Sequence, residues 1–245
     1  MNKVALITGA SSGIGYATAQ LLAENGIKVG LFARREQRLK TLAENISKKG
    51  GKALILKGDV TKRKDVENAV KEIIKEWSHI DILVNNAGLM PLSFIKNLHI
   101  DEWDRMVDVN IKGVLYMSAA VLPYMLKQHS GHIINVSSVA GRRVFPAGAV
   151  YCATKYAVRA FSDGLRCELT AQEKIRVTTI EPGIVKTELP NTITDIEIKE
   201  PFAKRTAAMR PLQANDIAKS ILYAISQPDY ADVAEILVIP TDQGT

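Results

Sequence analysis

The sequence predicts an α/β fold, a doubly wound seven-stranded parallel sheet with helices on both faces (a Rossmann fold). Short apolar runs recur along the chain, at residues 4–8, 29–33, 53–56, 80–84, 132–137, 176–180 and 236–239. They lack polar alternation, which is typical of strands buried on both faces of a sheet. The amphipathic stretches between them have the length of crossover helices. Ligands of such sheets bind at the carboxyl ends of the strands, so functional residues are expected directly after these runs.

Length and composition predict one compact domain over residues 1–245. The chain has 245 residues, of which 47% are hydrophobic and 24% charged, which suffices for one sizeable core. No stretch approaches the roughly 20 consecutive apolar residues of a membrane span. The N-terminal MNKVALITG runs directly into the first predicted strand and has no cleavable signal pattern. We therefore expect a soluble, cytoplasmic protein with no membrane partner.

The charge and the cysteines exclude other classes. The net charge is +6, but Lys and Arg are dispersed rather than gathered in a tract, so no nucleic-acid partner is expected. A mildly positive field favours an anionic small ligand instead. Cys152 and Cys167 are too few for a disulfide framework, and both are expected to be buried thiols in helices. No metal site is expected.

A glycine-rich turn, TGASSGIG, follows the first apolar run. A strand that turns sharply into a helix and lets a pyrophosphate touch the backbone needs residues without Cβ at the turn and at the contact. A tight turn alone would also use glycines, and the spacing differs from G-x-G-x-x-G, but the position after the first strand favours a dinucleotide site. The predicted cofactor contacts here are Gly9, Ser11, Ser12, Gly13, Ile14 and Gly15.

The second run ends in Ala33, Arg34 and Arg35, where folds that select NAD usually carry an acidic residue for the ribose 2′-hydroxyl. The acid is absent, and the planar fork of arginine suits a phosphate, so NADP(H) is the predicted cofactor. We expect Arg34 to face the 2′-phosphate more directly than Arg35. The alternative is that both arginines only open a solvated helix.

Polar residues also follow the third and fourth runs. Asp59, with Val60 beside it, is expected to accept a hydrogen bond from the adenine amino group or to cap the next helix. The sequence Asn85–Gly88 indicates a turn, whose residues Asn86, Ala87 and Gly88 also suit packing against the adenosine half of the cofactor.

These motifs together resemble the short-chain dehydrogenase/reductase family, in its shorter single-domain branch. TGASSGIG, NNAG, INVSSVAG, YCATK and EPGIVKT occur in the family's order over nearly the whole chain. The overall pattern is most similar to bacterial NADP-dependent dehydrogenases of 3-hydroxy acids such as serine. The resemblance implies hydride transfer between NADP(H) and an alcohol or carbonyl.

Tyr151 and Lys155 are the predicted acid/base pair. Positions four apart lie on one face of a helix, so the Lys155 ammonium can stand near the Tyr151 phenol. A phenol has a pKa near 10, which a nearby cation lowers by favouring the phenolate. Such a tyrosine can exchange a proton with an alcohol or carbonyl near neutral pH. The resemblance implies that Lys155 also binds the nicotinamide ribose.

Ser138 and Asn110 match the remaining catalytic positions of the family. A hydroxyl at Ser138 can stabilise charge on the substrate oxygen, while Ser137 is expected to satisfy backbone groups at the strand end. Asn110 is expected to divert helix hydrogen bonds and hold a water linked to Lys155, or else to bond only to its own turn.

The sixth run leads into a loop across the cleft, because Pro182 and Gly183 break the regular structure. The resemblance implies that the loop backbone grips the nicotinamide carboxamide, with Pro182, Gly183, Ile184 and Thr187 as contacts. A plain connector is the alternative. Glu181 departs from the family's pattern and places a carboxylate either near the pocket or on a solvated edge.

Residues 188–210 are polar and show no clear periodicity, so we expect a mobile substrate lid there. Arg142 and Arg143 either bind a substrate carboxylate, as a 3-hydroxy acid would require, or face water. The further pocket candidates are Met90, Leu92 and Phe145.

The function expected is therefore an NADP(H)-dependent oxidoreductase acting on a small alcohol or carbonyl substrate, with a 3-hydroxy acid as the suggested class. A broad-specificity carbonyl reductase and a non-catalytic NADPH-binding protein are the alternatives. The resemblance also implies a homotetramer, or a homodimer, in which the helices containing Asn110 and Tyr151 are buried against partner subunits.

Overall fold

A single seven-stranded parallel sheet forms the centre of the computed structural model, which describes residues 3–244. The strand order is β3-β2-β1-β4-β5-β6-β9, with every pairing parallel. Each predicted apolar run overlaps one strand, so the predicted fold class is confirmed. The strands are β1 Val4–Thr8, β2 Lys28–Ala33, β3 Ala53–Lys57, β4 Ile82–Asn85, β5 Gly131–Val136, β6 Ile175–Pro182 and β9 Glu235–Val238.

The order of the strands reverses beside β1, which pairs with β2 on one side and with β4 on the other. The topological switch point of the sheet therefore lies between the carboxyl ends of β1 and β4. Doubly wound sheets bind their ligands at this point. The predicted domain of residues 1–245 includes residues 1, 2 and 245, which lie outside the described residues.

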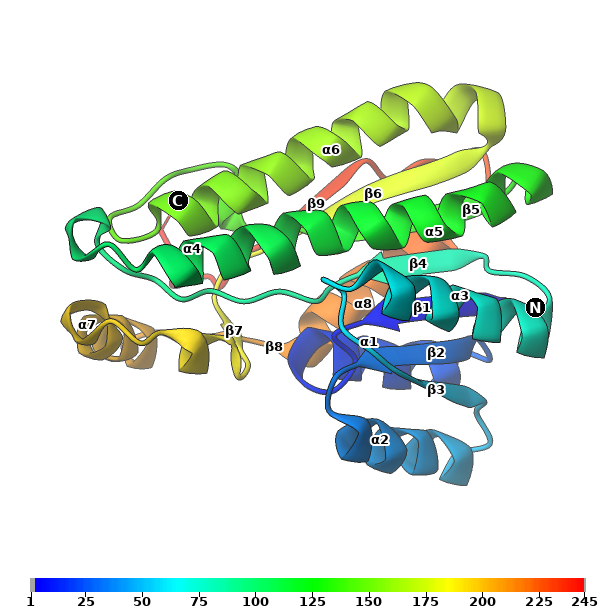
Figure 1. Cartoon of the computed structure of the whole chain (residues 1–245), viewed down its shortest axis with the longest axis horizontal. Coiled ribbons are helices and arrows are strands. Elements are labelled where there is room, and N and C mark those ends of the chain that lie inside the picture. Colours follow the sequence, from blue (N-terminus) through cyan, green and yellow to red (C-terminus); the bar gives the residue numbers. More distant parts are fainter. Residues whose placement is uncertain (1–2, 245) are drawn as a thin grey trace.

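Helices cover both faces of the sheet (Figure 1). One face carries α1 (Gly13–Glu24), α2 (Glu36–Lys48) and α8 (Ala214–Ser226), whose apolar residues join β1, β2 and β4 in one hydrophobic cluster. The other face carries α3 (Arg63–Trp77), α5 (Gly113–Gln128) and the long α6 (Ala149–Glu173), with a second cluster beneath them. The side chains of each strand alternate between the two clusters, which explains why the runs show no polar alternation.

A continuous helical run from Ile100 to Gln128 passes through α4 (Ile100–Val107), a π-helical turn (Asp108–Lys112) and α5. Within it, an 18-residue window has a mean hydropathy of 1.3 and is 39% buried, so by length and composition alone this run would suffice to cross a membrane. Its buried residues, among them Met117, Val121 and Met125, pack onto the sheet. The run is thus more apolar than the sequence pattern suggested, because its outer face is apolar as well.

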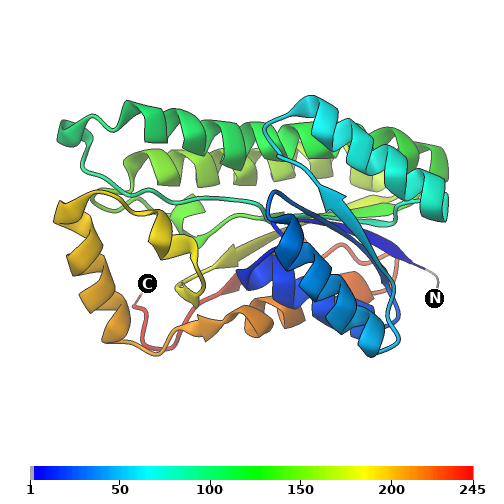
Figure 2. The same cartoon turned by 60° about the horizontal axis from the view of Figure 1, so that its bottom comes forward.

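The predicted lid, residues 188–210, is folded rather than irregular. It contains the short 3-10 turn η4 (Leu189–Thr192) and the helix α7 (Ile196–Ala207), which stands apart from the sheet at the end where the C-terminus lies (Figures 1 and 2). At its base, β7 (Val185–Lys186) pairs with β8 (Leu212–Gln213). Because α7 has no buried residue, it shows no apolar periodicity, and the sequence pattern missed it.

The two cysteines differ in burial. Cys152 is buried in α6 as expected, but Cys167 on the same helix is exposed, so its expected burial was wrong. The two positions are 15 apart, which places them about 60° apart round the helix, enough to move a side chain from the packed face to its edge.

Candidate active site

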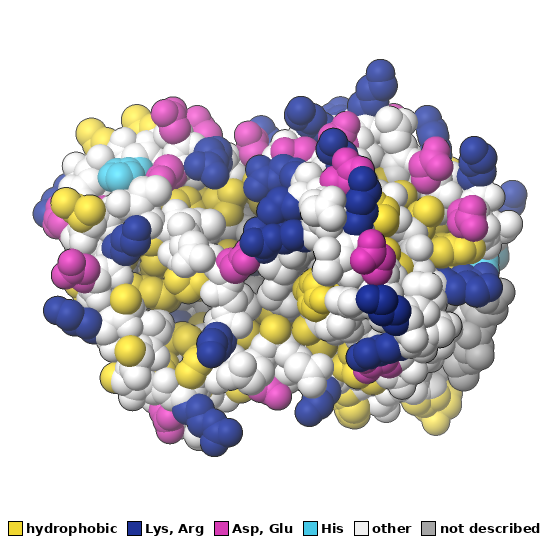
Figure 3. Space-filling model, turned by 90° about the horizontal axis from the view of Figure 1, so that it is seen from below, with side chains coloured by type: hydrophobic (Ala, Val, Ile, Leu, Met, Phe, Trp, Pro, Cys, Tyr) yellow, Lys and Arg dark blue, Asp and Glu magenta, His cyan; other side chains and the backbone are white. Residues whose placement is uncertain are grey.

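A large cavity lies at the carboxyl ends of the strands, with a volume of about 1430 Å³. The glycine turn, the ends of β2, β4 and β5, the loop after β6 and the lid line it. In the view from below, Lys and Arg side chains gather beside a hollow with hydrophobic walls (Figure 3). The cavity contains every residue predicted as a cofactor contact except Gly15, which lies beneath it, and three of the four predicted catalytic residues.

The glycine turn is shaped by close backbone contacts. Gly9 and Gly13 have φ values of 67° and 56°, a left-handed conformation that side chains with a Cβ rarely adopt. A Cβ at Gly15 would lie 2.6 Å from the carbonyl oxygen of Gly9 and 2.5 Å from Nδ2 of Asn86. The third glycine therefore lets α1 pack closely against the turn and against the segment after β4.

The ends of β1 and β4 are joined through one hydroxyl. Thr8 Oγ1 accepts hydrogen bonds from the backbone N–H groups of Asn86 at 2.9 Å and Ala87 at 3.0 Å. Asn86 Nδ2 donates to the carbonyl oxygen of Thr8 at 2.9 Å. Asn85 instead points into the core, where its Nδ2 donates to Ser118 and Asn135. The NNAG segment thus fixes the floor of the cleft, with Asn86, Ala87 and Gly88 at the cavity wall.

The two predicted phosphate-binding arginines lie differently. Arg34 is 69% exposed, and its closest carboxylate is Asp59 at 4.0 Å. Arg35 lies over the glycine turn, where Nε donates to Ser11 Oγ at 3.0 Å and Nη2 donates to Ser12 Oγ at 2.6 Å. Both arginines line the cavity, but Arg34 is largely exposed to solvent while hydrogen bonds hold Arg35 in place.

Asp59 lies at the cavity wall but is engaged in its own turn. Its Oδ1 accepts hydrogen bonds from the backbone N–H of Thr61 at 3.0 Å and from the Thr61 hydroxyl at 2.9 Å. Helix α3 begins after it, with Lys62 as the capping residue. Asp59 therefore orders the turn before α3 rather than capping the helix itself.

Tyr151 and Lys155 are both buried, with 5% and 7% exposure, and face the cavity from the first turns of α6. The ammonium lies 5.8 Å from the centre of the phenol ring, and Lys155 Nζ donates to the carbonyl oxygen of Val136 at 3.0 Å. Burial raises the pKa of Tyr151 to about 12 and lowers the pKa of Lys155 to about 8. The expected lowering of the phenol pKa by the ammonium is therefore wrong for the protein alone, because the loss of solvent outweighs a cation at this distance.

Ser138 begins the 3-10 turn η3 (Val139–Gly141) at the end of β5. Its Oγ accepts from the backbone N–H of Ala140 at 3.1 Å and donates to the carbonyl oxygen of Pro182 at 3.3 Å. A hydrogen bond with Ser138 also favours the phenolate of Tyr151 and so acts to lower its pKa against the effect of burial. Ser137 Oγ donates to the backbone carbonyl of Lys155 at 2.9 Å, so it bonds to backbone as expected, but to helix α6 rather than to the strand end.

Asn110 lies in the π-helical turn, so the predicted diversion of helix hydrogen bonds is present. Its Oδ1 accepts from the backbone N–H of Leu89 at 2.9 Å, while Nδ2 donates to the Leu89 carbonyl at 3.0 Å and to Thr154 at 3.1 Å. Gly88 lies between Asn110 and Lys155, since a Cβ there would be 3.3 Å from Asn110 Oδ1 and 3.8 Å from Lys155 Nζ.

The loop after β6 rests on a buried ion-pair network. Glu181 has a fully buried side chain and accepts from Arg142 Nε at 2.5 Å, with Arg159 Nε at 3.4 Å. Glu235 on β9 pairs with both arginines. Glu181 is thus neither a pocket carboxylate nor on a solvated edge. Arg142 is committed to these two carboxylates and does not line the cavity, so it is not a substrate-binding residue, whereas Arg143 does line it.

Pro182, Gly183, Ile184 and Thr187 all line the cavity. Ile184 N–H donates to Gln243 Oε1 at 2.8 Å, which joins this loop to the segment after β9. Thr187 lies against the glycine turn, because a Cβ at Gly13 would be 3.2 Å from its methyl carbon. The loop and the turn therefore face each other across the cleft, as the motif positions predicted.

The family described as short chain dehydrogenase matches residues 3–197. The chain belongs to the short-chain dehydrogenase family. An uncharacterized oxidoreductase of Staphylococcus saprophyticus is 47% identical over 243 residues, which are 99% of this chain and 97% of the relative. The protein is therefore an oxidoreductase of a family that uses a nicotinamide cofactor and acts on CH–OH groups.

Solved structures of the family have the same fold. A serine dehydrogenase in its closed form, complexed with NADP+, has a TM-score of 0.90 at 33% identity and covers 99% of this chain and 96% of its own. A short-chain dehydrogenase/reductase from Burkholderia phymatum in complex with NAD has a TM-score of 0.89 at 26% identity, covering 96% of this chain and 88% of its own. The fold thus accompanies either coenzyme, and the choice depends on individual residues.

Several residues of the site were not found from the sequence. Thr8, at the end of the first run, was visible only as part of the glycine turn, while Arg38, Glu188 and Gln243 reach the cavity from segments that no motif marks. Only the tertiary structure brings these residues to the cleft. In residues 3–244, no group of three or more His, Cys, Asp or Glu side chains is arranged to hold a metal ion.

Proposed function

We propose that this protein is an NADP(H)-dependent oxidoreductase that transfers hydride between nicotinamide and a small alcohol or carbonyl substrate. The observation that carries the coenzyme choice is that no acid ends β2, where one would select NAD, whereas Arg34 and Arg35 directly after it and Arg38 in the first turn of α2 all line the cavity. A guanidinium pairs strongly with phosphate, whereas it gains little from a ribose hydroxyl.

The cleft fits a dinucleotide. Gly9 and Gly13, which adopt positive φ values, leave two positions of the turn without a side chain where a pyrophosphate would approach the N-terminus of α1. The adenosine would rest against Asp59, Val60 and the NNAG segment, and the nicotinamide half against the loop from Pro182 to Thr187. When bound, the coenzyme supplies or accepts the hydride.

The chain's own residues manage one proton. In the reductive direction, the Tyr151 phenol donates its proton to the substrate oxygen, while the Ser138 hydroxyl stabilises the charge that develops there. The buried Lys155 ammonium, close behind the ring, stabilises the phenolate that remains. Asn110 holds the backbone of Leu89 and so positions the wall next to Lys155.

A 3-hydroxy acid is the first substrate class to test, since the serine dehydrogenase structure is 33% identical and covers 99% of this chain. Arg143 is a cavity-lining cation that a carboxylate can reach, although Arg142 is not. A broad-specificity carbonyl reductase is the second candidate. It is favoured by apolar side chains from loops and lid at the same end of the cavity, namely Leu89, Met90, Leu92, Phe145, Ile198 and Phe202.

The test is a panel of 3-hydroxy acids, aldehydes and ketones, each followed by the absorbance of the reduced nicotinamide with NADP(H) and with NAD(H). Turnover with NADP(H) well above that with NAD(H) is the expected result. Faster turnover of apolar ketones than of any hydroxy acid would favour the carbonyl reductase. Tight NADPH binding without turnover of any substrate would favour a non-catalytic role.

We further propose a cytoplasmic homotetramer, with a homodimer as the alternative. Large apolar side chains are exposed on the helices that contain Asn110 and Tyr151, namely Val107, Leu115 and Tyr156. Apolar surface of this kind on neighbouring helices suits burial against a second copy. A monomeric mass in small-angle scattering would contradict this proposal.

A further inference from the structure

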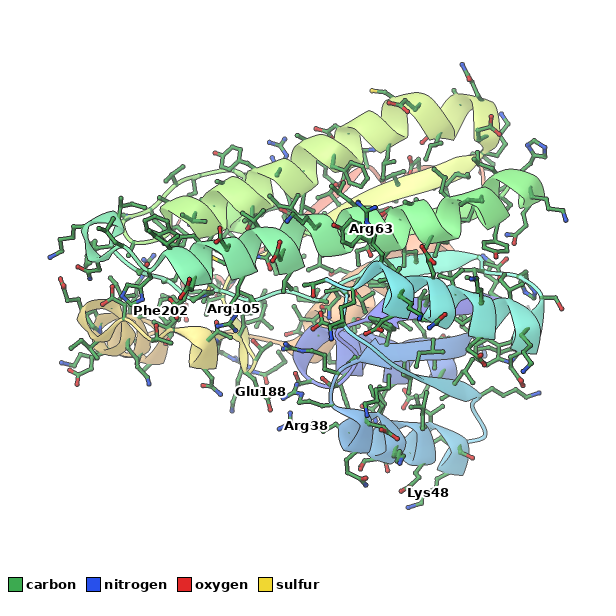
Figure 4. The ribbon with its side chains drawn as sticks, in the orientation of Figure 1. Arg38, Lys48, Arg63, Arg105, Glu188 and Phe202 are labelled. Carbon is green, nitrogen blue, oxygen red and sulfur yellow. The ribbon has the colours of Figure 1, made fainter. Side chains whose placement is uncertain are left out.

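Glu188 joins the two sides of the cofactor cleft. Its carboxylate lies directly after Thr187, on the segment that leads into the lid, and accepts from Arg35 Nη1 at 2.7 Å and from Arg38 Nη1 at 2.6 Å. Arg35 directly precedes α2, and Arg38 lies in the first turn of α2. Glu188 and Arg38 point toward each other across the gap between α2 and the segment after β7 (Figure 4).

All three guanidinium nitrogens of Arg35 make hydrogen bonds. Its Nε and Nη2 bond to the Ser11 and Ser12 hydroxyls, and its Nη1 bonds to Glu188. One carboxylate therefore pairs with two of the three cavity-lining arginines near the start of α2 and offsets part of their positive charge. The pKa of Glu188 is lowered to about 2 by its hydrogen bonds to Arg35 and Arg38, so the carboxylate is charged at neutral pH.

We propose that Glu188 acts as an internal competitor of the coenzyme's 2′-phosphate for Arg35 and Arg38, and so sets the selectivity between NADP(H) and NAD(H). This inference rests on the proposed 2′-phosphate site. A phosphate that approaches these guanidiniums carries about −1.5 to −2 charges and meets a carboxylate already bound to them. Like charges on shared donors repel, so the phosphate must displace Glu188 or lose part of its attraction to the arginines.

The exchange is feasible because both ion pairs are accessible to solvent. The side chains of Glu188, Arg35 and Arg38 are 44%, 44% and 48% exposed. Exposed pairs of this kind are weak, whereas a phosphate dianion offers more charge and more acceptor oxygens to the same donors. A coenzyme without the 2′-phosphate does not compete for these donors, so Glu188 should leave NAD(H) binding unaffected.

The experiment titrates Glu188→Gln and the unchanged protein with NADP+ and with NAD+, and isothermal titration calorimetry measures each Kd. Glutamine keeps the shape of the side chain and removes its charge. We expect the Kd for NADP+ to fall about fivefold and the Kd for NAD+ to change by less than about twofold, since two weak exposed pairs no longer oppose the phosphate. The fragments 2′-AMP and 5′-AMP should show the same contrast.

Glu24→Gln is the matched control. Glu24 is 42% exposed and pairs with Lys49 at 2.7 Å, away from the large cavity, so its loss changes the net charge equally without touching the arginines. An unchanged or raised Kd for NADP+ in Glu188→Gln would overturn the proposal, as would an equal gain in Glu24→Gln. An equal loss for both coenzymes would also overturn it and identify Glu188 as a clamp over the cleft.

The result is separable from the coenzyme preference proposed above. If the unchanged protein prefers NAD+ but Glu188→Gln still binds 2′-AMP more tightly, the NADP(H) proposal fails and the competition stands. If the unchanged protein prefers NADP+ and the variant binds it no better, the competition fails and the NADP(H) proposal stands.

Discussion

The Lys155 ammonium lies 5.8 Å from the centre of the Tyr151 ring, and its hydrogen bond goes to the carbonyl oxygen of Val136. The two groups occupy one face of α6, one turn apart, and both are almost fully buried. Burial keeps the phenol protonated, with a pKa of about 12, and it weakens the hold of Lys155 on its proton. Without coenzyme, Tyr151 is therefore a protonated proton donor. Further stabilisation of its phenolate requires positive charge that a bound coenzyme brings to the site.

Tyr151→Phe tests the proton donor. The variant keeps the ring packing and removes the hydroxyl, so turnover should fall by about a thousandfold or more while NADPH binding stays within a few fold. Steady-state kinetics and a coenzyme titration measure the two effects separately. Turnover close to that of the unchanged protein would show that another group supplies the proton.

The low pKa of Lys155 predicts how stability changes with pH. Its pKa is about 8 in the folded protein and 10.5 in a solvated chain, so between these values the unfolded chain binds the extra proton and stability rises with pH. Relative to Lys155→Met, the unchanged protein should gain about 1 kcal/mol in free energy of unfolding from pH 7 to pH 9. Urea denaturation of both proteins at both pH values measures this difference, and an equal pH response of the two would argue against a buried, titrating ammonium.

Arg34→Glu should move coenzyme selectivity toward NAD(H). The variant places a carboxylate where NAD-selective folds have one and removes an exposed guanidinium, so the ratio of kcat/KM for NADP+ over NAD+ should fall about tenfold or more. Lys48→Glu is the control, because it makes the same charge change at the far end of α2 (Figure 4). A selectivity ratio that does not move would show that the 2′-phosphate is bound elsewhere.

Gly88→Ala tests the space between Asn110 and Lys155. The new methyl would lie 3.3 Å from Asn110 Oδ1, tighter than most side-chain contacts, so the site must shift by a few tenths of an ångström. We expect turnover to fall about tenfold with little loss of thermal stability, since small misplacements at a reacting centre are costly. Gly164→Ala in α6 is the control, because nothing lies within 4 Å of its added Cβ. Equal kinetics of both variants with the unchanged protein would remove any positioning role for this contact.

The sequence predicted the sheet well because strands buried on both faces leave continuous apolar runs, and every run became a strand. Most of the motif residues came to one cavity for a related reason, since most of them directly follow runs whose ends meet at the same edge of the sheet. Helix α7 was missed because none of its residues is fully buried and only part of it, including Ile198 and Phe202, packs against apolar residues, which leaves little periodic pattern. Cys167 was wrongly expected to be buried because composition alone does not tell the packed face of α6 from its edge.

The sequence by itself determined the fold class, the family resemblance and the residues that could carry proton transfer, because these depend on local patterns and spacings. Only the tertiary structure decided which charges meet. In the folded protein, Arg142 pairs with the buried Glu181 and does not reach the cavity. Glu188 pairs with Arg35 and Arg38, which lie more than a hundred residues earlier in the chain. Ion pairs between distant segments leave no mark in sequence spacing, since either charge could as well face water.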